Sequence, residues 1–347
     1  MPEAIPQTML AARYHGPRKP LVVERVAVPG PGPGEALVRV RAAGVCRTEL
    51  HFLDGLLDLG VAPLILGHEI VGEVAALGPG ADGVKPGDRV LVGYYGTCGR
   101  CHWCRTGREN LCGQPVAQLG FTADGGYAEY VKAPARIMVP LPLELDFVAA
   151  SSLGCSLTTA LHAAGTIANL QAGETAVVYG AGGVGFALVQ VSKARGATVI
   201  AVGRSPKRLD RARALGADAT INATCEKVAE RIRALTDGEG ADVIFELVGV
   251  RETMDASAAA LRKRGRLVFL GYSADPFVVN PLRLVIDEAI VTASVGNTLQ
   301  ELHDAVAWAA TGKFQASVDR TFPLAEAPAA LEALRRGEIV GRAVLLP

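Results

Sequence analysis

The chain has 347 residues, 50% hydrophobic and 20% charged, which is long enough for two globular domains. Lysine and arginine number 35, as do aspartate and glutamate, so the formal net charge is zero. This balance offers no basic stripe for nucleic acid or an anionic membrane surface, and we expect neither as a partner.

Cysteine usage and the apolar segments predict a cytoplasmic protein. Seven cysteines, an odd number, argue against a closed disulfide framework and favour metal binding by clustered thiols. Met1–His15 shows no basic region followed by an apolar one, so we expect no signal peptide. The most apolar window, Thr175–Val191, is interrupted by four glycines and is typical of a buried strand and helix.

The first part of the chain consists of short β-type runs separated by Pro/Gly turns. The turns include Pro29–Gly34 and Lys85–Asp88, and the clearest strands are Ala36–Arg41, Glu69–Leu77 and Arg89–Val92. Many short strands with frequent turns predict a barrel-like, mostly antiparallel domain.

Four cysteines in the pattern C-x2-C-x2-C-x7-C predict a metal site within this first part. They are Cys98, Cys101, Cys104 and Cys112. Four thiolates bind Zn²⁺ tetrahedrally at about 2.3 Å and leave no open position, so such a site is structural. The surrounding residues 96–113 are glycine-rich, and metal binding would have to order them. The alternative is four unrelated thiols in one loop.

From about Ser151 strands alternate with helices, which predicts a parallel sheet. Ser205 and Pro206 mark one helix start, and Thr224 is predicted to cap the helix that carries Val228, Ile232 and Leu235. Six strands, the number in a complete dinucleotide-binding sheet, are expected at Thr175–Gly180, Ala197–Val202, Ala219–Asn222, Asp242–Leu247, Arg266–Gly271 and Ile290–Val295.

The C-terminal part of the chain is predicted to rejoin the first domain. A helix around Leu302–Ala310 follows the sixth strand, and a last β-type segment covers Gly341–Leu346. We therefore expect a catalytic domain of residues 1–152 and 298–347, with the cysteine lobe at 96–113, and a dinucleotide-binding domain of residues 153–297.

A G-x-G-x-x-G turn follows the strand at Thr175 and opens a helix. Its glycines permit a tight turn and close approach of a pyrophosphate to the helix N-terminus. The expected cofactor-binding residues here are Gly180, Gly182, Gly183, Val184 and Gly185. A glycine-rich packing turn is the alternative.

The end of the following strand favours NADP(H) over NAD(H). An NAD-binding chain usually places Asp or Glu there, but this chain has Gly203 followed by Arg204. A carboxylate would repel a 2′-phosphate, whereas a guanidinium pairs with it. Ser205 and Arg208 complete the predicted site, although these cations could also simply solvate the helix start.

Three further residues, Cys46, His68 and Cys155, suggest a second metal site. Cys46 lies close to Thr48 and His51, and His68 follows one loop later. A lone cysteine is more often a small core residue, as we expect for Cys225.

The chain resembles the zinc-containing medium-chain alcohol dehydrogenases over nearly its whole length. The segment Gly67–Gly72 with Gly78 matches that family's zinc signature, the four-cysteine lobe its structural-zinc loop, and Gly180–Gly185 its cofactor turn. The resemblance implies a GroES-like catalytic domain, a Rossmann domain and two zinc ions per chain. It also implies that Cys46, His68 and Cys155 bind the catalytic zinc, with Glu69 beside them.

In this family zinc acts as a Lewis acid on the substrate oxygen, and hydride passes between the substrate carbon and the nicotinamide. The resemblance implies that Thr48 takes the alcohol proton and that His51 delivers it towards solvent. The family usually has Asp where this chain has Glu49. Glutamate keeps the charge but is one methylene longer, which alters the geometry of the contact that orients the zinc-bound histidine.

Other roles follow from the resemblance by position. Arg47 and Arg342 are expected to contact the pyrophosphate, with a solvated or structural arginine as the alternative. Val295, Gly296 and Asn297 are expected to line the nicotinamide pocket. The substrate pocket is expected to include Tyr94, Tyr95 and Leu119, and two tyrosines favour an apolar, aromatic or allylic alcohol or aldehyde.

Three alternatives stay open at this stage. The same zinc chemistry could act on a larger polyol or an acyl-thioester alcohol. A zinc-independent enoyl or quinone reductase shares the fold, and a non-catalytic dinucleotide-binding protein could keep the scaffold. The family forms homodimers or homotetramers, in dimers through the last strand of the cofactor sheet, here Ile290–Val295.

Overall fold

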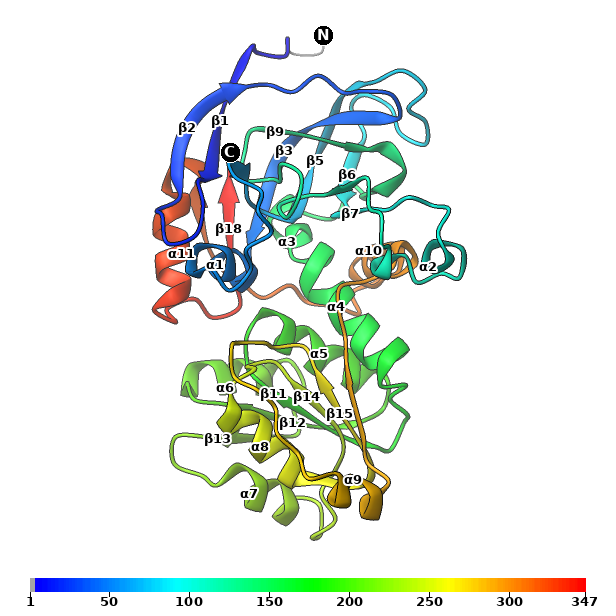
Figure 1. The fold of residues 1–347 in the computed structure, drawn as a ribbon, viewed down its shortest axis with the longest axis vertical. Coiled ribbons are helices and arrows are strands. Elements are labelled where there is room, and N and C mark those ends of the chain that lie inside the picture. Colours follow the sequence, from blue (N-terminus) through cyan, green and yellow to red (C-terminus); the bar gives the residue numbers. More distant parts are fainter. Residues whose placement is uncertain (1–3) are drawn as a thin grey trace. The chain divides into compact units, whose positions relative to one another are not determined.

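The computed structural model describes residues 4–347, which form two compact units (Figure 1). The first unit takes the described residues up to Cys155 together with Thr298–Gly312 and Ala316–Pro347. The second takes Ser156–Asn297 and Lys313–Gln315. The first and the last of the described residues therefore belong to the same unit.

The first unit is built on a seven-stranded sheet in the order β10-β6-β5-β3-β18-β17, with β9 also pairing with β3. Its pairs are antiparallel except β17 with β18. The strands are β3 (Glu35–Val45), β5 (Glu69–Leu77), β6 (Arg89–Val92), β9 (Tyr130–Pro134), β10 (Met138–Pro140), β17 (Val318–Pro323) and β18 (Arg342–Leu346). The predicted C-terminal strand thus pairs with β3, nearly 300 residues earlier.

Smaller elements complete the first unit. Its two small sheets have the orders β2-β1-β4 and β7-β8. Their strands are β1 (Thr8–Tyr14), β2 (Val22–Ala27), β4 (Leu64–Ile65), β7 (Tyr95–Gly96) and β8 (Ala117–Gln118). The helices are α1 (Arg47–Asp54), α2 (His102–Arg105), α3 (Phe147–Ser151), α10 (Leu299–Ala310) and α11 (Ala327–Arg335), with 3₁₀ turns at η1 (Glu109–Leu111), η2 (Ala135–Ile137) and η5 (Leu324–Glu326).

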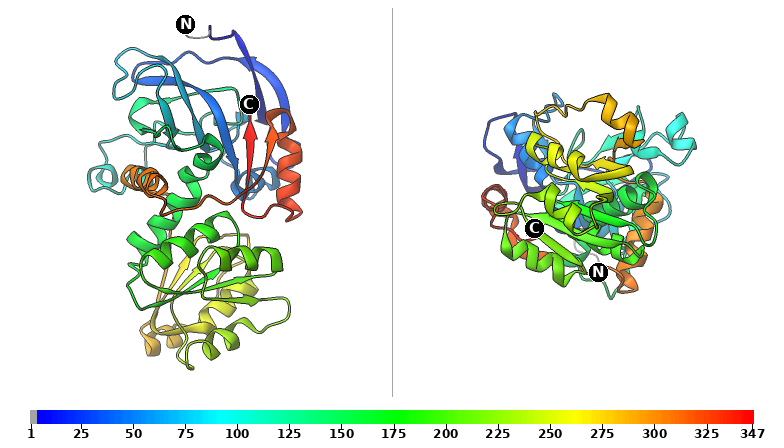
Figure 2. Two further views of the ribbon diagram at one scale, coloured as in Figure 1. Left: turned by 180° about the vertical axis from the view of Figure 1, so that it is seen from behind. Right: turned by 90° about the horizontal axis from the view of Figure 1, so that it is seen from below.

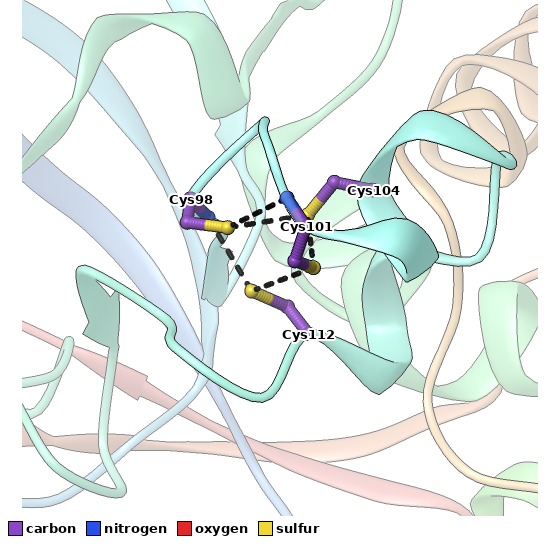
Figure 3. Close-up of side chains that lie close together, drawn as sticks. All are labelled: Cys98, Cys101, Cys104 and Cys112. Atoms are coloured by element: carbon purple, nitrogen blue, oxygen red, sulfur yellow. Dashed lines mark hydrogen bonds between the residues drawn. The ribbon is translucent and has the colours of Figure 1, made fainter.

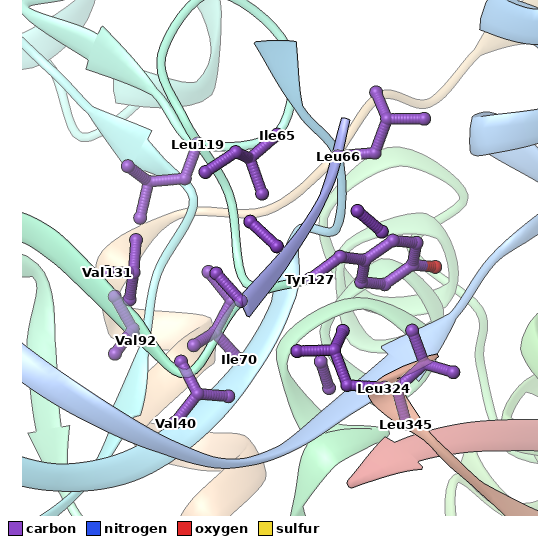
Figure 4. Packing of buried hydrophobic residues seen from close by; sticks show 14 of the residues in the cluster. Val40, Ile65, Leu66, Ile70, Val92, Leu119, Tyr127, Val131, Leu324 and Leu345 are labelled. Atoms are coloured by element: carbon purple, nitrogen blue, oxygen red, sulfur yellow. The ribbon is translucent and has the colours of Figure 1, made fainter. Parts of the chain in front are cut away.

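The core of the first unit lies between its sheets and is almost entirely apolar. Figure 4 shows Ile70, Val92 and Leu119 among the side chains of this core, together with Tyr127, which is fully buried. Alternating apolar positions on short strands produce such a core, because one face of each strand points inwards. The predicted barrel-like, mostly antiparallel architecture is confirmed.

The second unit holds a six-stranded parallel sheet in the order β13-β12-β11-β14-β15-β16, seen from two further sides in Figure 2. The strands are β11 (Thr175–Tyr179), β12 (Thr198–Gly203), β13 (Ala219–Asn222), β14 (Ala241–Glu246), β15 (Leu261–Phe269) and β16 (Ile290–Ala293). The helices are α4 (Thr158–Leu161), α5 (Gly183–Ala194), α6 (Pro206–Ala214), α7 (Val228–Ala234), α8 (Arg251–Ala260) and α9 (Pro281–Asp287). The predicted Rossmann architecture is confirmed.

Two local predictions in the second unit are wrong. Helix α7 begins after Lys227, because the amide and the hydroxyl of Thr224 donate to the Asn222 side chain at 3.0 and 2.7 Å and close a turn instead of capping the helix. Cys225 lies in that turn and is exposed, so it is not a core residue.

One helical run, Phe147–Ile167, is long and apolar enough to cross a membrane by length and composition alone. Of its most apolar window, 72% is buried within the protein, as in the core helix of a globular fold. Two π-helical stretches interrupt it, η3 (Leu153–Leu157) and η4 (His162–Ile167).

Candidate metal centre and dinucleotide site

The end of strand β3 places the first candidate ligand. Cys46 is buried and precedes helix α1, whose third residue is Glu49. The Glu49 carboxylate accepts the Cys46 backbone N–H through Oε2 at 3.0 Å, while its Oε1 lies 2.8 Å from Nδ1 of His68. One glutamate therefore ties the start of α1 to the imidazole and leaves Nε2 of His68 as the ring nitrogen available to a metal.

Two glycines make room around the second candidate ligand. Gly67, which precedes His68, has φ +94°, and a Cβ there would lie 2.3 Å from the Tyr127 ring. Gly44 on β3 pairs with Glu69 on β5, and a Cβ at Gly44 would lie 2.0 Å from Glu69 Oε2. The zinc signature therefore needs glycine directly before His68 and opposite Glu69 on β3.

The third candidate ligand, Cys155, lies in the π-helical segment η3. Short π-helical insertions are frequent at functional sites. The hydrogen bond with Cys46, followed by burial, raises the pKa of Cys155, and the same hydrogen bond lowers the pKa of Cys46. The two thiols therefore lie in contact with each other.

These residues meet in one buried cluster that fits a zinc ion. The ligand atoms of Cys46, His68, Glu69 and Cys155 all lie within 4.8 Å of one another. Within the described residues, Glu69 Oε2 has no hydrogen-bond partner. Thiolate and imidazole donors with a neighbouring carboxylate are the set that zinc prefers, and a divalent cation offsets the repulsion between buried anions.

Arg342 on strand β18 adds a cation that the sequence did not reveal at this place. Its Nη2 lies 2.8 Å from Glu69 Oε1 and 3.7 Å from Cys155 Sγ, and its side chain is buried. Burial raises the pKa of Glu69 to about 7, while the guanidinium opposes that shift. The predicted contact of Arg342 with a pyrophosphate stays a prediction.

The four remaining clustered cysteines point towards one another in Figure 3. Their Sγ atoms are 3.5 Å apart for Cys101 and Cys104, and 3.9 Å apart for Cys98 and Cys104 and for Cys101 and Cys112. Sulfurs at the corners of a ZnS₄ tetrahedron lie about 3.8 Å apart, given Zn–S bonds of about 2.3 Å. This lobe therefore has the geometry of a closed zinc site.

The lobe is also linked to helix α10. Glu109, which lies between Cys104 and Cys112, accepts the backbone N–H of Leu299 at 2.6 Å, at the first residue of that helix. The amides at a helix start have no partner within the helix, so this carboxylate stabilises the start of α10.

The predicted proton-transfer residues lie on helix α1. Thr48 Oγ1 is 3.6 Å from Cys46 Sγ, which puts this hydroxyl at the edge of the metal cluster. Burial, followed by the positive charge of Arg47, lowers the pKa of His51 below its ordinary value. Arg47 itself is exposed.

Aromatic side chains surround His68, and one of them was missed. The Tyr94 ring lies 5.3 Å from the imidazole and 4.3 Å from the Tyr95 ring, and Leu119 is buried in the same core. Phe121, also 5.3 Å from His68 and stacked on Tyr94 at 5.7 Å, was not foreseen. It lies in a loop without a regular pattern, so no periodicity marked it.

In the second unit, the glycine turn lies between β11 and α5. Gly180 has φ +127°, Gly182 caps α5, and a Cβ at Gly185 would lie 2.0 Å from the Gly180 carbonyl oxygen. Only glycine permits this tight strand-to-helix connection, which leaves the amides at the start of α5, including those of Gly183 and Val184, available to an anion.

The residues predicted to meet a 2′-phosphate lie at the end of the neighbouring strand. Gly203 ends β12, and a Cβ there would lie 3.3 Å from both Ala181 and Leu209. Arg204 is exposed, while Ser205 and Arg208 are half-buried at the start of α6. Beyond β16, Val295 is half-exposed, Gly296 has φ +58° and Asn297 is buried.

A Cys/His/Cys cluster in a mostly antiparallel unit, together with a glycine turn on a parallel six-stranded sheet, defines a zinc-binding dehydrogenase. The chain matches the alcohol dehydrogenase GroES-like domain over residues 32–143 and the zinc-binding dehydrogenase domain over residues 183–311.

Whole proteins of this kind match over nearly their full length. An alcohol dehydrogenase of Geobacillus stearothermophilus is 34% identical over 97% of this chain and 99% of its own. An NAD-dependent alcohol dehydrogenase of Sulfurisphaera tokodaii is 36% identical over 95% and 97%. The crystal structure of the alcohol dehydrogenase from Aeropyrum pernix superposes with a TM-score of 0.92 at 34% identity, covering 97% of this chain and all of the other. The chain belongs to the zinc-containing medium-chain alcohol dehydrogenase family.

Proposed function

We propose that this protein is a zinc-dependent alcohol dehydrogenase that interconverts an alcohol and its aldehyde or ketone with a nicotinamide dinucleotide. The buried cluster of Cys46, His68, Glu69 and Cys155, with all its ligand atoms within 4.8 Å, carries the proposal. The alternatives without zinc or without catalysis give no reason to bury two thiols, an imidazole and a carboxylate together.

Within this cluster Cys46, His68 and Cys155 would hold the zinc. When bound, zinc polarises the substrate oxygen as a Lewis acid, and the nicotinamide supplies or accepts the hydride. Glu49 orients the imidazole through Nδ1, while Arg342 offsets the charge of Glu69 and the thiolates. The four-cysteine lobe would hold a second zinc ion with a structural role.

The proton of the alcohol would be handled by helix α1. Thr48 Oγ1, next to the cluster, accepts it, and His51 releases it towards solvent. Because burial lowers the pKa of His51, the imidazole is neutral at physiological pH and able to act as a base.

For the dinucleotide we propose NADP(H), although the relatives at 35–36% identity are named NAD-dependent. Strand β12 ends in Gly203 without a carboxylate, and the following Arg204 is exposed. Because Gly203 carries no side-chain charge, it would not repel the 2′-phosphate of NADP(H). The guanidinium of Arg204 could then pair with this phosphate.

For the substrate we propose an apolar, preferably aromatic or allylic, alcohol or aldehyde. Tyr94, Tyr95 and Phe121 present flat faces beside His68, and flat substrates stack favourably on such walls. A larger polyol or an acyl-thioester alcohol would need more polar contacts than the two tyrosine hydroxyls of this wall supply.

The test is reduction of matched short aliphatic, long aliphatic, benzylic and allylic aldehydes, with NADPH and NADH in parallel. We expect turnover on benzylic and allylic members and tighter binding of NADPH. Tighter binding of NADH would refute the dinucleotide assignment, and turnover confined to the aliphatic aldehydes would refute the preference for aromatic and allylic substrates. Absence of turnover on all of them, in protein that holds two zinc ions, would refute the proposed substrate class as a whole.

The edge of the parallel sheet in the second unit supports a homo-oligomer. β16 is an edge strand, and Ile290 on it is 51% exposed. The nearby helix α9 exposes Leu282, Val285 and Ile286 at 62 to 73%. We expect a second copy to continue the sheet there, as the family resemblance implies, and light scattering after gel filtration should give at least twice the chain mass.

A further inference from the structure

A fully buried carboxylate ends strand β14 in the second unit. Glu246 is 0% exposed and lies at the carboxyl edge of the parallel sheet. Burying a carboxylate is costly unless it is hydrogen-bonded on all sides, so its presence requires a compensating contact network.

That network binds the loop directly after the strand. Glu246 Oε1 accepts the Val248 N–H at 3.1 Å and the Thr253 hydroxyl at 2.7 Å, and Oε2 accepts the Gly249 N–H at 2.9 Å. All three partners donate, and these hydrogen bonds oppose the rise in the pKa of Glu246 that burial causes. The side chain thereby fixes residues 247–250, here called the β14 loop.

The β14 loop lies where this fold binds ligands. The strand order reverses between β11 and β14, and in open parallel sheets the ligand crevice forms at that point, beyond the carboxyl ends of the strands. Tyr179 and Glu246 are paired in register on these two strands, so the glycine turn and the β14 loop leave the sheet side by side.

Contacts on both sides show how closely the β14 loop is fitted. A Cβ at Gly180 would lie 3.1 Å from Leu247 Cβ and 3.5 Å from Val248 Cγ2. On the other side Gly249, with φ +76°, packs so tightly that its Cβ would lie 2.4 Å from Tyr272 Cα. The Ser273 hydroxyl also donates to the Gly249 carbonyl at 2.6 Å.

We infer that Glu246 is a positioning residue for the dinucleotide: its carboxylate holds the β14 loop against the Gly180 turn as one wall of the crevice. This inference rests on the proposed function for the identity of the ligand. Replacing the carboxylate by an amide puts an N–H₂ group opposite one or more N–H donors, so the loop loses its anchor while the side-chain volume is kept.

The test is a titration of Glu246→Gln with NADPH and with NADH, in which the fluorescence of the bound nicotinamide measures binding. Steady-state kinetics are measured in parallel. Glu230→Gln, an exposed carboxylate on α7, is the matched control. We expect the Kd and KM for the dinucleotide to rise about tenfold, the effect of losing one hydrogen bond to a charged group. We expect kcat at saturation to stay within about twofold, which separates positioning from general structural damage.

A Glu246→Gln variant that folds and binds the dinucleotide as tightly as the Glu230→Gln control would overturn the inference. If Glu246→Gln does not fold, Thr253→Val decides by the same criterion, because it removes one donor and keeps the carboxylate. Failure of the unsubstituted protein to bind either dinucleotide would refute the proposed function instead. Binding without alcohol turnover would leave the titration valid and refute only the substrate assignment.

Discussion

Shortening Glu49 to aspartate perturbs the carboxylate that joins two ligand-bearing segments. In Glu49→Asp the carboxyl group retreats by about 1.5 Å, the length of one carbon–carbon bond. It then cannot keep both the 2.8 Å contact with His68 Nδ1 and the 3.0 Å hydrogen bond from the Cys46 amide. One of the two contacts must lengthen beyond hydrogen-bonding distance.

The expected magnitude follows from the lost contact. A hydrogen bond to a charged group contributes about 1.5–3 kcal/mol, which corresponds to roughly a tenfold to hundredfold change in an equilibrium. Replacing the hydrogen-bond partner of a metal-bound histidine typically lowers metal affinity by a similar factor, about tenfold to a hundredfold. We therefore expect Glu49→Asp to release the zinc of the Cys46 cluster tenfold to a hundredfold more readily, even though aspartate is the residue usual in the family.

Zinc release to a chromophoric chelator measures this directly. Glu301→Asp is the matched control, because Glu301 accepts the Thr298 amide at 2.8 Å in the same arrangement at the start of α10, with no metal ligand involved. The control should lower the unfolding temperature and leave the release of the zinc in the Cys46 cluster unchanged. Glu49→Asp protein that keeps its zinc as firmly as the unsubstituted protein would show that the Glu49 contacts do not position His68.

Three further outcomes follow from the geometry. Gly203→Asp should shift the ratio of NADPH to NADH affinity towards NADH by about tenfold or more, because a carboxylate repels the 2′-phosphate; an unchanged ratio in the paired titrations would speak against the NADP(H) assignment. The pKa of His51 lies below its ordinary value of 6.5, so alcohol oxidation should decline only as the pH falls below 6.5, and His51→Gln should abolish that decline in the pH–rate profile. Gly44→Ala should lower zinc content and the unfolding temperature, because its Cβ would lie 2.0 Å from Glu69 Oε2, whereas Gly113→Ala meets no atom within 4 Å and should change neither.

The features that the sequence revealed are those with local causes. The spacing of the four cysteines places all of them within one short lobe, so the lobe could be predicted without knowing what it packs against. The glycine turn follows a buried strand and opens a helix, a pattern that is complete within about a dozen residues. Strands β5, β6 and β13 were predicted to the residue for the same reason.

The features that stayed hidden depend on pairing between distant segments. Arg342 reaches Glu69 because β18 pairs with β3, and no local pattern gives the register of strands so far apart. The two contacts of Glu49 combine a helix cap, which is local, with an imidazole that arrives on another strand. Thr224 failed as a cap because the Asn222 side chain competes for its amide.

The zinc content of the purified protein, compared with that of Cys46→Ser, tests the central claim most directly. Serine is a poor zinc ligand, and Cys46 lies outside the four-cysteine lobe. The two clusters predict two zinc ions per chain in the unsubstituted protein and one in Cys46→Ser, with alcohol turnover lost in the variant. Two zinc ions retained by Cys46→Ser, or undiminished turnover, would contradict the assignment of Cys46, His68 and Cys155 as the catalytic metal centre.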